Sequence, residues 1–88
     1  METTVAGKLQ VYPSPVNDQA KIEITDTNEG LLKVQLWNVA GALQKQFIWN
    51  KNTPQYHNII FVGDLLKGEY ILRIEINKQV RSEKFIKL

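Results

Sequence analysis

Hydrophobicity alternates with a period of two residues in the most regular segments of this chain, which are residues 21–25, 32–36 and 70–76. Strict alternation is typical of strands that have one face on a core and the other in water. Clusters of Gly, Pro, Asn and Asp separate these segments at short intervals, and no segment shows the 3.6-residue period of an amphipathic helix. The pattern therefore predicts an all-β fold.

Strands are predicted over residues 8–12, 19–25, 32–38, 42–49, 56–62, 69–76 and 80–87. Short strands in this number favour a seven-stranded antiparallel immunoglobulin-like β-sandwich. The length of 88 residues suits one such domain over residues 8–88, after a polar lead-in or linker, residues 1–7, that we expect to be flexible. The sequence has no cysteine, which excludes the immunoglobulin disulfide and all thiolate chemistry.

The charges of the last two strands predict a register for the final hairpin. With a three-residue loop over residues 77–79, opposite charges meet on the outer face in the pairs Glu75–Arg81, Arg73–Glu83 and Glu69–Lys87. The remaining outer pair is Ile71–Phe85, and the inner pairs are Tyr70–Ile86, Leu72–Lys84, Ile74–Ser82 and Ile76–Val80. This register places Lys84 on the inner face, from which its ammonium group would have to reach the sandwich edge.

A second hairpin is predicted to turn at residues 38–41. Asn at the first position and Gly at the last suit a type I turn in which Gly41 takes a positive φ. The core pairs would then be Leu36–Leu43 and Leu32–Phe47. On the same alternation one tryptophan, Trp37, points outward or ends its strand, and the other, Trp49, packs inside.

No catalytic, cofactor or metal site is predicted. The single histidine, His57, is interpreted as a strand-edge residue, since the chain has neither a second histidine nor a cysteine to complete a metal site. The candidate acids all fall in predicted turns, and residues 26–29 match no calcium-loop spacing: Asp18, Asp26, Glu29 and Asp64. Neither serine, Ser14 or Ser82, lies in a nucleophile elbow.

The charge pattern argues against nucleic-acid binding, because a net charge of +2 is spread over scattered lysines rather than gathered in a patch. No apolar run is long enough to span a membrane as a helix, and the first residues do not resemble a signal peptide. The predicted outer faces carry apolar residues, among them Ile48, which indicates a surface for interaction.

Four segments together resemble one known family. In chain order they read VYPSPV (11–16), LWNVAG (36–41), DLLKGEYILRI (64–74) and VRSEKFIKL (80–88). Their order and spacing are similar to those of the type A C-terminal sorting domain of the type IX, or Por, secretion system. The sequence departs from the family pattern at Ser14, at Trp37-Asn38 and at Phe61. The matched motif positions are Tyr12, Pro13, Pro15, Gly41, Leu65, Gly68 and Tyr70.

Physical roles for several of these residues follow from their types. The two prolines, Pro13 and Pro15, fix φ and withhold donors, so they are expected to end the first strand. Gly68 suits a positive φ where a turn enters the sixth strand. The ring of Tyr70 is expected to be buried with its hydroxyl on a backbone group, as in a tyrosine corner.

The resemblance implies a non-catalytic secretion signal at the C-terminus of a longer exported precursor, and we expect the missing signal peptide to belong to that precursor. The implied partners are the type IX translocon, outer-membrane shuttle and sortase proteins, and a cargo domain fused upstream. The implied route runs through the periplasm to the outer membrane, the cell surface or the medium, with removal by a cell-surface sortase. The residues that the family ties to translocon recognition correspond to Lys84, Phe85, Ile86, Lys87 and Leu88.

Two further expectations remain open at this point. The alternative function is an accessory module of a secreted enzyme that binds carbohydrate or protein through Trp37 and neighbouring aromatic residues. The last strand is expected to lie near a sheet edge, so the isolated domain is also expected to be able to form a homodimer by strand exchange.

Overall fold

The computed structural model describes residues 8–13 and 15–88, and these residues form seven strands and no helix. The predicted lead-in, residues 1–7, lies outside the described residues, as does Ser14. Every predicted strand is present, with its ends within two residues of the prediction. The strands are β1 (Lys8–Tyr12), β2 (Gln19–Thr25), β3 (Gly30–Asn38), β4 (Leu43–Lys51), β5 (Gln55–Phe61), β6 (Gly68–Ile76) and β7 (Gln79–Lys87).

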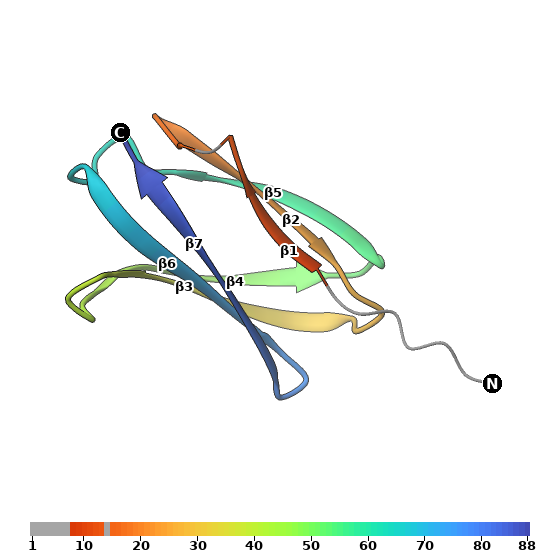
Figure 1. Ribbon diagram of the computed structural model, residues 1–88. Coiled ribbons are helices and arrows are strands. Elements are labelled where there is room, and N and C mark those ends of the chain that lie inside the picture. Colours follow the sequence, from red (N-terminus) through yellow and green to blue (C-terminus); the bar gives the residue numbers. More distant parts are fainter. Residues whose placement is uncertain (1–7, 14) are drawn as a thin grey trace.

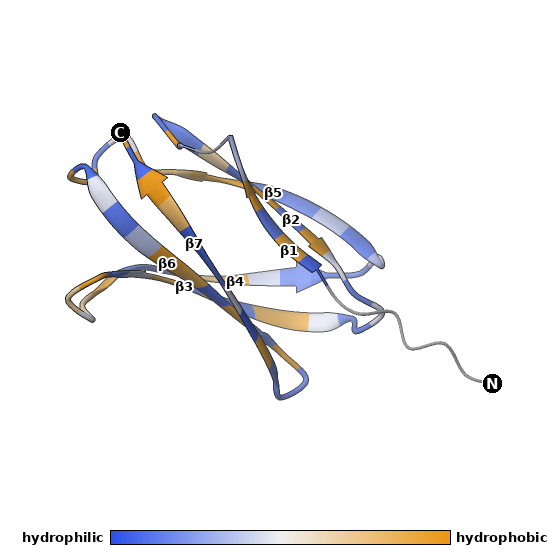
Figure 2. Ribbon diagram, in the orientation of Figure 1, coloured by the Kyte–Doolittle hydropathy of each residue, from blue (hydrophilic) through white to orange (hydrophobic). Residues whose placement is uncertain are grey.

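The strands form two antiparallel sheets, of order β1-β2-β5 and β4-β3-β6-β7, that face each other as a sandwich (Figure 1). This arrangement confirms the predicted immunoglobulin-like fold. Hydropathy changes from residue to residue along the strands, so each sheet has an apolar inner face (Figure 2). The buried core consists of Val16, Ala20, Ile22, Ile24, Leu32, Val34, Leu36, Ile60, Val62, Tyr70, Leu72, Ile74, Ile76 and Phe85.

The predicted turn between β3 and β4 is present, but the predicted register of this hairpin is wrong. Gly41 has a φ of +85°, and its N–H donates to Asn38 O at 3.0 Å. A β-bulge between Leu36 and Trp37 shifts the pairing, so that the observed pairs are Trp37–Leu43, Leu36–Lys45 and Leu32–Trp49. Leu43 is therefore 41% exposed rather than in the core, whereas Trp49 packs against the core as predicted.

The predicted register of the final hairpin is also wrong, by one residue. Asn77 and Lys78 both have positive φ, at 50° and 69°, which makes a two-residue turn in place of the three-residue loop. The observed pairs are Ile76–Gln79, Glu75–Val80, Ile74–Arg81, Arg73–Ser82, Leu72–Glu83, Ile71–Lys84, Tyr70–Phe85, Glu69–Ile86 and Gly68–Lys87. None of the three predicted cross-strand charge pairs forms in this hairpin.

This one-residue difference exchanges the two faces of β7. The residues predicted to face inward, Ser82, Lys84 and Ile86, are exposed, and Phe85, which was predicted to face outward, is buried. The two-residue turn puts an aromatic side chain into the core at the position where the predicted register would have put Ile86. The awkward inward lysine of the prediction does not occur, because Lys84 lies on the outer face opposite Ile71.

At the end of the sandwich that holds the β2–β3 loop, a lysine side chain is fully buried. Lys51 is 0% exposed, and its Nζ donates to three main-chain oxygens: Asp26 O at 2.6 Å, Asn28 O at 2.7 Å and Thr53 O at 2.7 Å. A buried ammonium group is tolerated only when its donors are satisfied, and here each of its three N–H donors has an acceptor. We call the residues Asp26, Asn28, Lys51 and Arg81 the lysine end.

The buried carboxylate of Asp26 completes the lysine end. It accepts from the N–H and the side-chain amide of Asn28 at 2.8 and 2.7 Å, and Arg81 Nη2 lies 3.4 Å away. Burial alone would raise the pKa of this carboxyl group, but the hydrogen bonds from Asn28 and Arg81 outweigh it, so the pKa is lowered from 3.8. The side chain of Asn28 also bonds Gln79, which ties the β2–β3 loop to the start of β7.

Candidate functional site: the C-terminal end of the sandwich

The family motif positions, although scattered along the sequence, lie at one end of the sandwich. Tyr12 pairs with Lys21 beside the start of β2, Asn38 at the end of β3 pairs with Tyr70, and Gly68 pairs with Lys87. The β3–β4 and β5–β6 loops belong to the same end, where the chain finishes (Figure 1). We call this region the C-terminal end, and it is opposite the lysine end.

Alternation along β7 divides the five residues predicted to be recognised by the translocon into two sets. Phe85 and Lys87 face inward and are buried, at 3% and 6% exposure. Lys84, Ile86 and Leu88 face outward, and the two apolar side chains are 48% and 60% exposed. A partner could therefore touch the side chains of the outward set in the folded domain, whereas the inward set maintains the fold.

The inward set is held by Tyr70. The rings of Tyr70 and Phe85 stack with their centroids 5.9 Å apart and an interplanar angle of 23°. The Tyr70 hydroxyl donates to Leu66 O at 2.6 Å, which is the predicted tyrosine corner. Leu65 packs against the core beside it and donates its N–H to Val62 O at 3.0 Å, so the β5–β6 loop is fixed at both ends.

Val16, in the segment between β1 and β2, binds the end of β7 through two main-chain hydrogen bonds. It is fully buried, its N–H donates to Ile86 O at 2.8 Å, and its carbonyl accepts from Leu88 N at 2.8 Å. These two bonds form a parallel bridge opposite Lys87, whose Nζ donates to Leu88 O at 2.6 Å. Sequence reasoning gave Val16 no role, because a single apolar residue between turn residues carries no periodic signal.

The segment with the two prolines, Pro13 and Pro15, connects β1 to Val16. β1 ends at Tyr12, the residue before Pro13, as predicted, and both Pro13 and Pro15 are exposed. The Tyr12–Pro13 peptide bond is cis. The Tyr12 hydroxyl donates to Glu23 Oε1 at 3.3 Å, and Lys21 Nζ lies 5.5 Å from the centre of its ring, so the start of the segment is held on β2.

The glycine at the start of β6 has the predicted positive φ. Gly68 has a φ of +149°, a conformation that side-chain-bearing residues rarely adopt, although a Cβ there would meet no atom within 4 Å. The requirement for glycine is therefore conformational rather than steric. The positive φ lets the chain turn from the β5–β6 loop into β6, so that the Tyr70 hydroxyl lies within hydrogen-bond distance of Leu66 O.

A charged contact also marks the C-terminal end. Lys45 Nζ lies 3.0 Å from Asp64 Oδ1 and donates to Phe61 O at 2.8 Å, which links β4 to the end of β5. The hydrogen bond from Lys45 lowers the pKa of the Asp64 carboxyl group below 3.8. Phe61 itself is 55% exposed.

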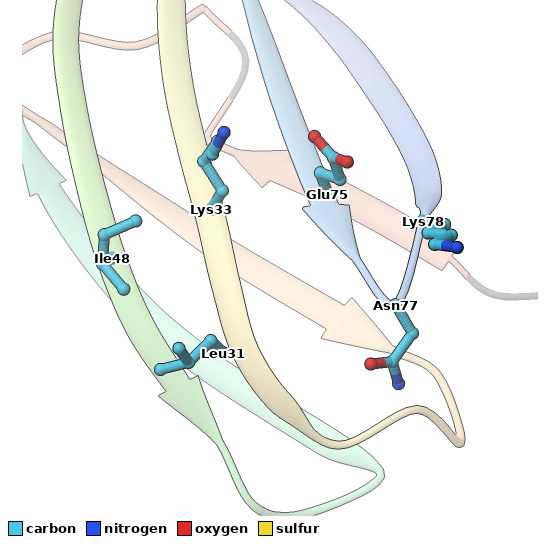
Figure 3. Close-up of a pocket in the computed structure, with 6 residues that line it drawn as sticks. All are labelled: Leu31, Lys33, Ile48, Glu75, Asn77 and Lys78. Atoms are coloured by element: carbon cyan, nitrogen blue, oxygen red, sulfur yellow. The ribbon is translucent and has the colours of Figure 1, made fainter.

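A shallow groove lies elsewhere, on the outer face of the four-stranded sheet, with a volume of about 260 Å³. Figure 3 shows its apolar side chains on β3 and β4 and its polar ones on β3, β6 and the β6–β7 turn; the lining residues are Leu31, Lys33, Ile48, Glu75, Asn77 and Lys78. Trp37, the predicted carbohydrate contact, does not line it. This tryptophan is half-buried at the end of β3, between its partners Leu43 and Ile71.

The described residues assemble no candidate metal site. Within residues 8–13 and 15–88, no three His, Asp or Glu side chains are placed to hold a metal ion. His57 is exposed on the edge strand β5, with Nδ1 3.5 Å from Glu23 Oε2. The described part of the chain has no helix with the length and apolar character needed to cross a membrane.

The fold and the site define a small β-sandwich whose motif residues fix the position of its last strand. Residues 10–88 match the sequence pattern of the secretion system C-terminal sorting domain, and this match covers most of the chain. The chain belongs to this family. No curated protein matches it.

Family membership makes the domain a C-terminal sorting signal for type IX secretion. It links the chain to the type IX machinery and to a cargo protein to which such a domain is fused. It also implies export to the outer membrane or cell surface, or secretion.

Proposed function

We propose that this domain is a non-catalytic signal that is recognised in its folded state and directs an upstream cargo from the periplasm through the type IX outer-membrane translocon. A cell-surface sortase then removes the domain from the cargo. The observation that carries the proposal is the family match over residues 10–88. The geometry supports it, because Tyr70 stacks on Phe85, and Val16, the last residue of the matched segment 11–16, bonds β7 at Ile86 and Leu88.

The recognition surface in this proposal is the outward set of β7: Lys84, Ile86 and Leu88. Exposed apolar side chains beside a cation are well suited to a protein partner. A further apolar side chain at the same end of the sandwich, Leu66 in the β5–β6 loop, is 84% exposed. Phe85 and Lys87 contribute indirectly, since they hold the strand in place.

The export assay is a fusion of residues 8–88 behind a signal peptide and a reporter, expressed in a strain that has the type IX system. The reporter is expected at the cell surface or in the medium, and its retention in the periplasm would contradict the proposal. Deletion of residues 84–88 is expected to abolish export. This deletion also removes Phe85 from the core, so single outward substitutions are the sharper variants.

Sortase removal has a separate readout in the same assay. The exported reporter is expected to lack the domain, which shortens the fusion by somewhat less than 10.1 kDa, the mass of the 88-residue chain. An exported reporter that retains all of residues 8–88 would contradict removal without contradicting the sorting function.

The alternative is a carbohydrate-binding module that uses Trp37. The geometry favours it less, because this side chain is half-buried and lies outside the groove on the sheet face. Binding on a glycan array that is lost in Trp37→Ala would favour this alternative.

A further inference from the structure

The outer edge of β7 is covered only in part. β7 is the last strand of its sheet, and Val16 bonds it at Ile86 and Leu88. Those two residues therefore point their main-chain N–H and C=O groups away from β6. Because backbone direction alternates along a strand, Val80, Ser82 and Lys84 point theirs the same way. Within the described part of the chain, no backbone hydrogen bond from another strand reaches this stretch.

Although β1 contacts β7, this stretch has no backbone partner on its outer side among the described residues, and it is regular enough to accept another strand. The β6–β7 register continues without a shift from Gly68–Lys87 to Ile76–Gln79, so no bulge twists the edge away. No proline interrupts residues 79–85. Bulges and prolines are two of the features that protect an edge, and without them a regular edge can accept a strand. Charged residues are a third, so a partner of residues 79–85 must match the charges of Arg81, Glu83 and Lys84.

We infer that the occupant of this edge is a second copy of the chain, paired antiparallel through β7 with Ser82 opposite Ser82. In this register Arg81 of each copy faces Glu83 of the other, which gives two opposite-charge pairs about the two-fold axis. The outward residues Val80 and Lys84 face each other across the same axis. The two four-stranded sheets then form one continuous sheet.

The charge sequence selects this register among its neighbours. In an antiparallel pair, the main-chain N–H and C=O groups of two opposite residues both point toward the other strand or both point away from it. A residue paired with its own copy always meets this condition, so a two-fold symmetric pairing can be centred on any residue of β7. Centring on residue 81 sets Arg81 against Arg81, and centring on 83 sets Glu83 against Glu83. A centre at 84 opposes two lysines, and a centre at 80 uses only the start of the edge.

Both charged side chains can reach a second copy. Glu83 is exposed and forms none of the ion pairs found among the described residues. The Arg81 side chain is 33% exposed, and its contact with Asp26 is long, at 3.4 Å. Its guanidinium group carries five donors. The contact with Asp26 uses one and Nε is buried, so the remaining donors of the two terminal nitrogens are left for a carboxylate from outside.

This pairing differs from strand exchange, because each copy keeps its own β7 in its own sheet. It also leaves Ile86 and Leu88 outside the paired stretch, so dimerisation and the proposed translocon contact use neighbouring parts of one strand. The inference does not depend on the proposed function, and its test requires no secretion assay.

The test measures the mass of the 88-residue chain by sedimentation velocity over a range of concentrations. The chain is expected to dimerise reversibly, and Glu83→Arg is expected to weaken the dimer at least about tenfold, because two attractive pairs become repulsive. Glu69→Arg is the matched control: it makes the same charge change at an exposed position on β6 and should leave dimerisation unchanged.

A backbone variant provides the second arm. Ser82→Pro removes an N–H that points away from β6, so the fold should survive while the central dimer bonds are lost; Ser82→Ala should dimerise normally. Circular dichroism checks that each variant folds. A monomer at all concentrations, or a dimer that tolerates both Ser82→Pro and Glu83→Arg, would overturn the inference, and the latter would indicate strand exchange or another surface.

Discussion

The two ends of the sandwich are closed by different chemistry. At the lysine end, the buried ammonium group of Lys51 donates to main-chain carbonyl oxygens, and the buried carboxylate of Asp26 accepts from the main-chain N–H of Asn28. These bonds link the end of β4 to the β2–β3 loop. At the C-terminal end, an aromatic stack and a backbone bridge hold β7, and apolar side chains remain exposed around it. The comparison indicates that the buried groups of the lysine end serve stability, whereas the C-terminal end combines stability with the surface proposed for the translocon. Of the lysine end, only Arg81 is also part of a proposed contact, the one with a second copy.

The largest effect is expected at the lysine end, from Lys51→Met. This substitution keeps the length of the side chain but leaves one buried and two part-buried carbonyl oxygens without their donor, which should reduce the free energy of unfolding by about 3–5 kcal/mol. Urea unfolding followed by circular dichroism measures the change. Lys33→Met is the control on the neighbouring strand, since Lys33 is exposed and the loss should be below about 0.5 kcal/mol. Equal losses in the two variants would contradict the role given to Lys51.

A smaller effect is expected at the C-terminal end, from Tyr70→Phe. The variant keeps the stack on Phe85 but removes the donor to Leu66 O, so the free energy of unfolding should fall by about 1 kcal/mol. Tyr56→Phe is the matched control, because that hydroxyl only accepts from the nearby Asn58 amide and should matter less. If Tyr70→Phe unfolds at the wild-type urea concentration, the tyrosine corner does not stabilise this end.

The smallest effect is the pH dependence contributed by Asp26. The pKa of its carboxyl group is lowered in the folded state, so its contribution to stability is present above the unfolded value near 3.8 and is lost as the pH falls through the folded value. Asp26→Asn should therefore lose less stability than the wild type between pH 5 and acid pH, in urea unfolding series. Asp64, whose pKa is also lowered, is unchanged in both proteins and cancels from the difference. Parallel curves for the two proteins would show that Asp26 contributes nothing.

The strands, the fold class and several local features could be predicted because each depends on neighbouring residues. Alternation and the spacing of turn residues located all seven strands, Gly41 and Gly68 indicated positive φ, and Tyr70 indicated the tyrosine corner. The two hairpin registers could not be predicted in the same way. Asn77 and Lys78 form a tight turn without the glycine that usually signals one, and nothing in the sequence marks the bulge after Leu36.

Which residues of the candidate site a partner can reach depends on the register of the β6–β7 hairpin. Residues 84–88 were predicted as one group, and a one-residue shift determines which of them face the core and which a partner can reach. Cross-strand charge pairing, worth a few tenths of a kcal/mol per pair, gave way to burial of Phe85 against Tyr70, which is worth several times more. The buried Lys51 was missed for a related reason, because a lysine at the end of a strand normally indicates solvent.

The most direct test of the central claim compares two isoleucines on outer sheet faces in the export assay. Ile86 on β7 is 48% exposed and Ile48 on β4 is 57% exposed, so Ile86→Ser and Ile48→Ser remove similar apolar surface without entering the core. Both variants should unfold at nearly the wild-type urea concentration. The account predicts that the Ile86→Ser fusion is retained in the periplasm while the Ile48→Ser fusion is exported normally, and equal export of the two fusions would contradict it.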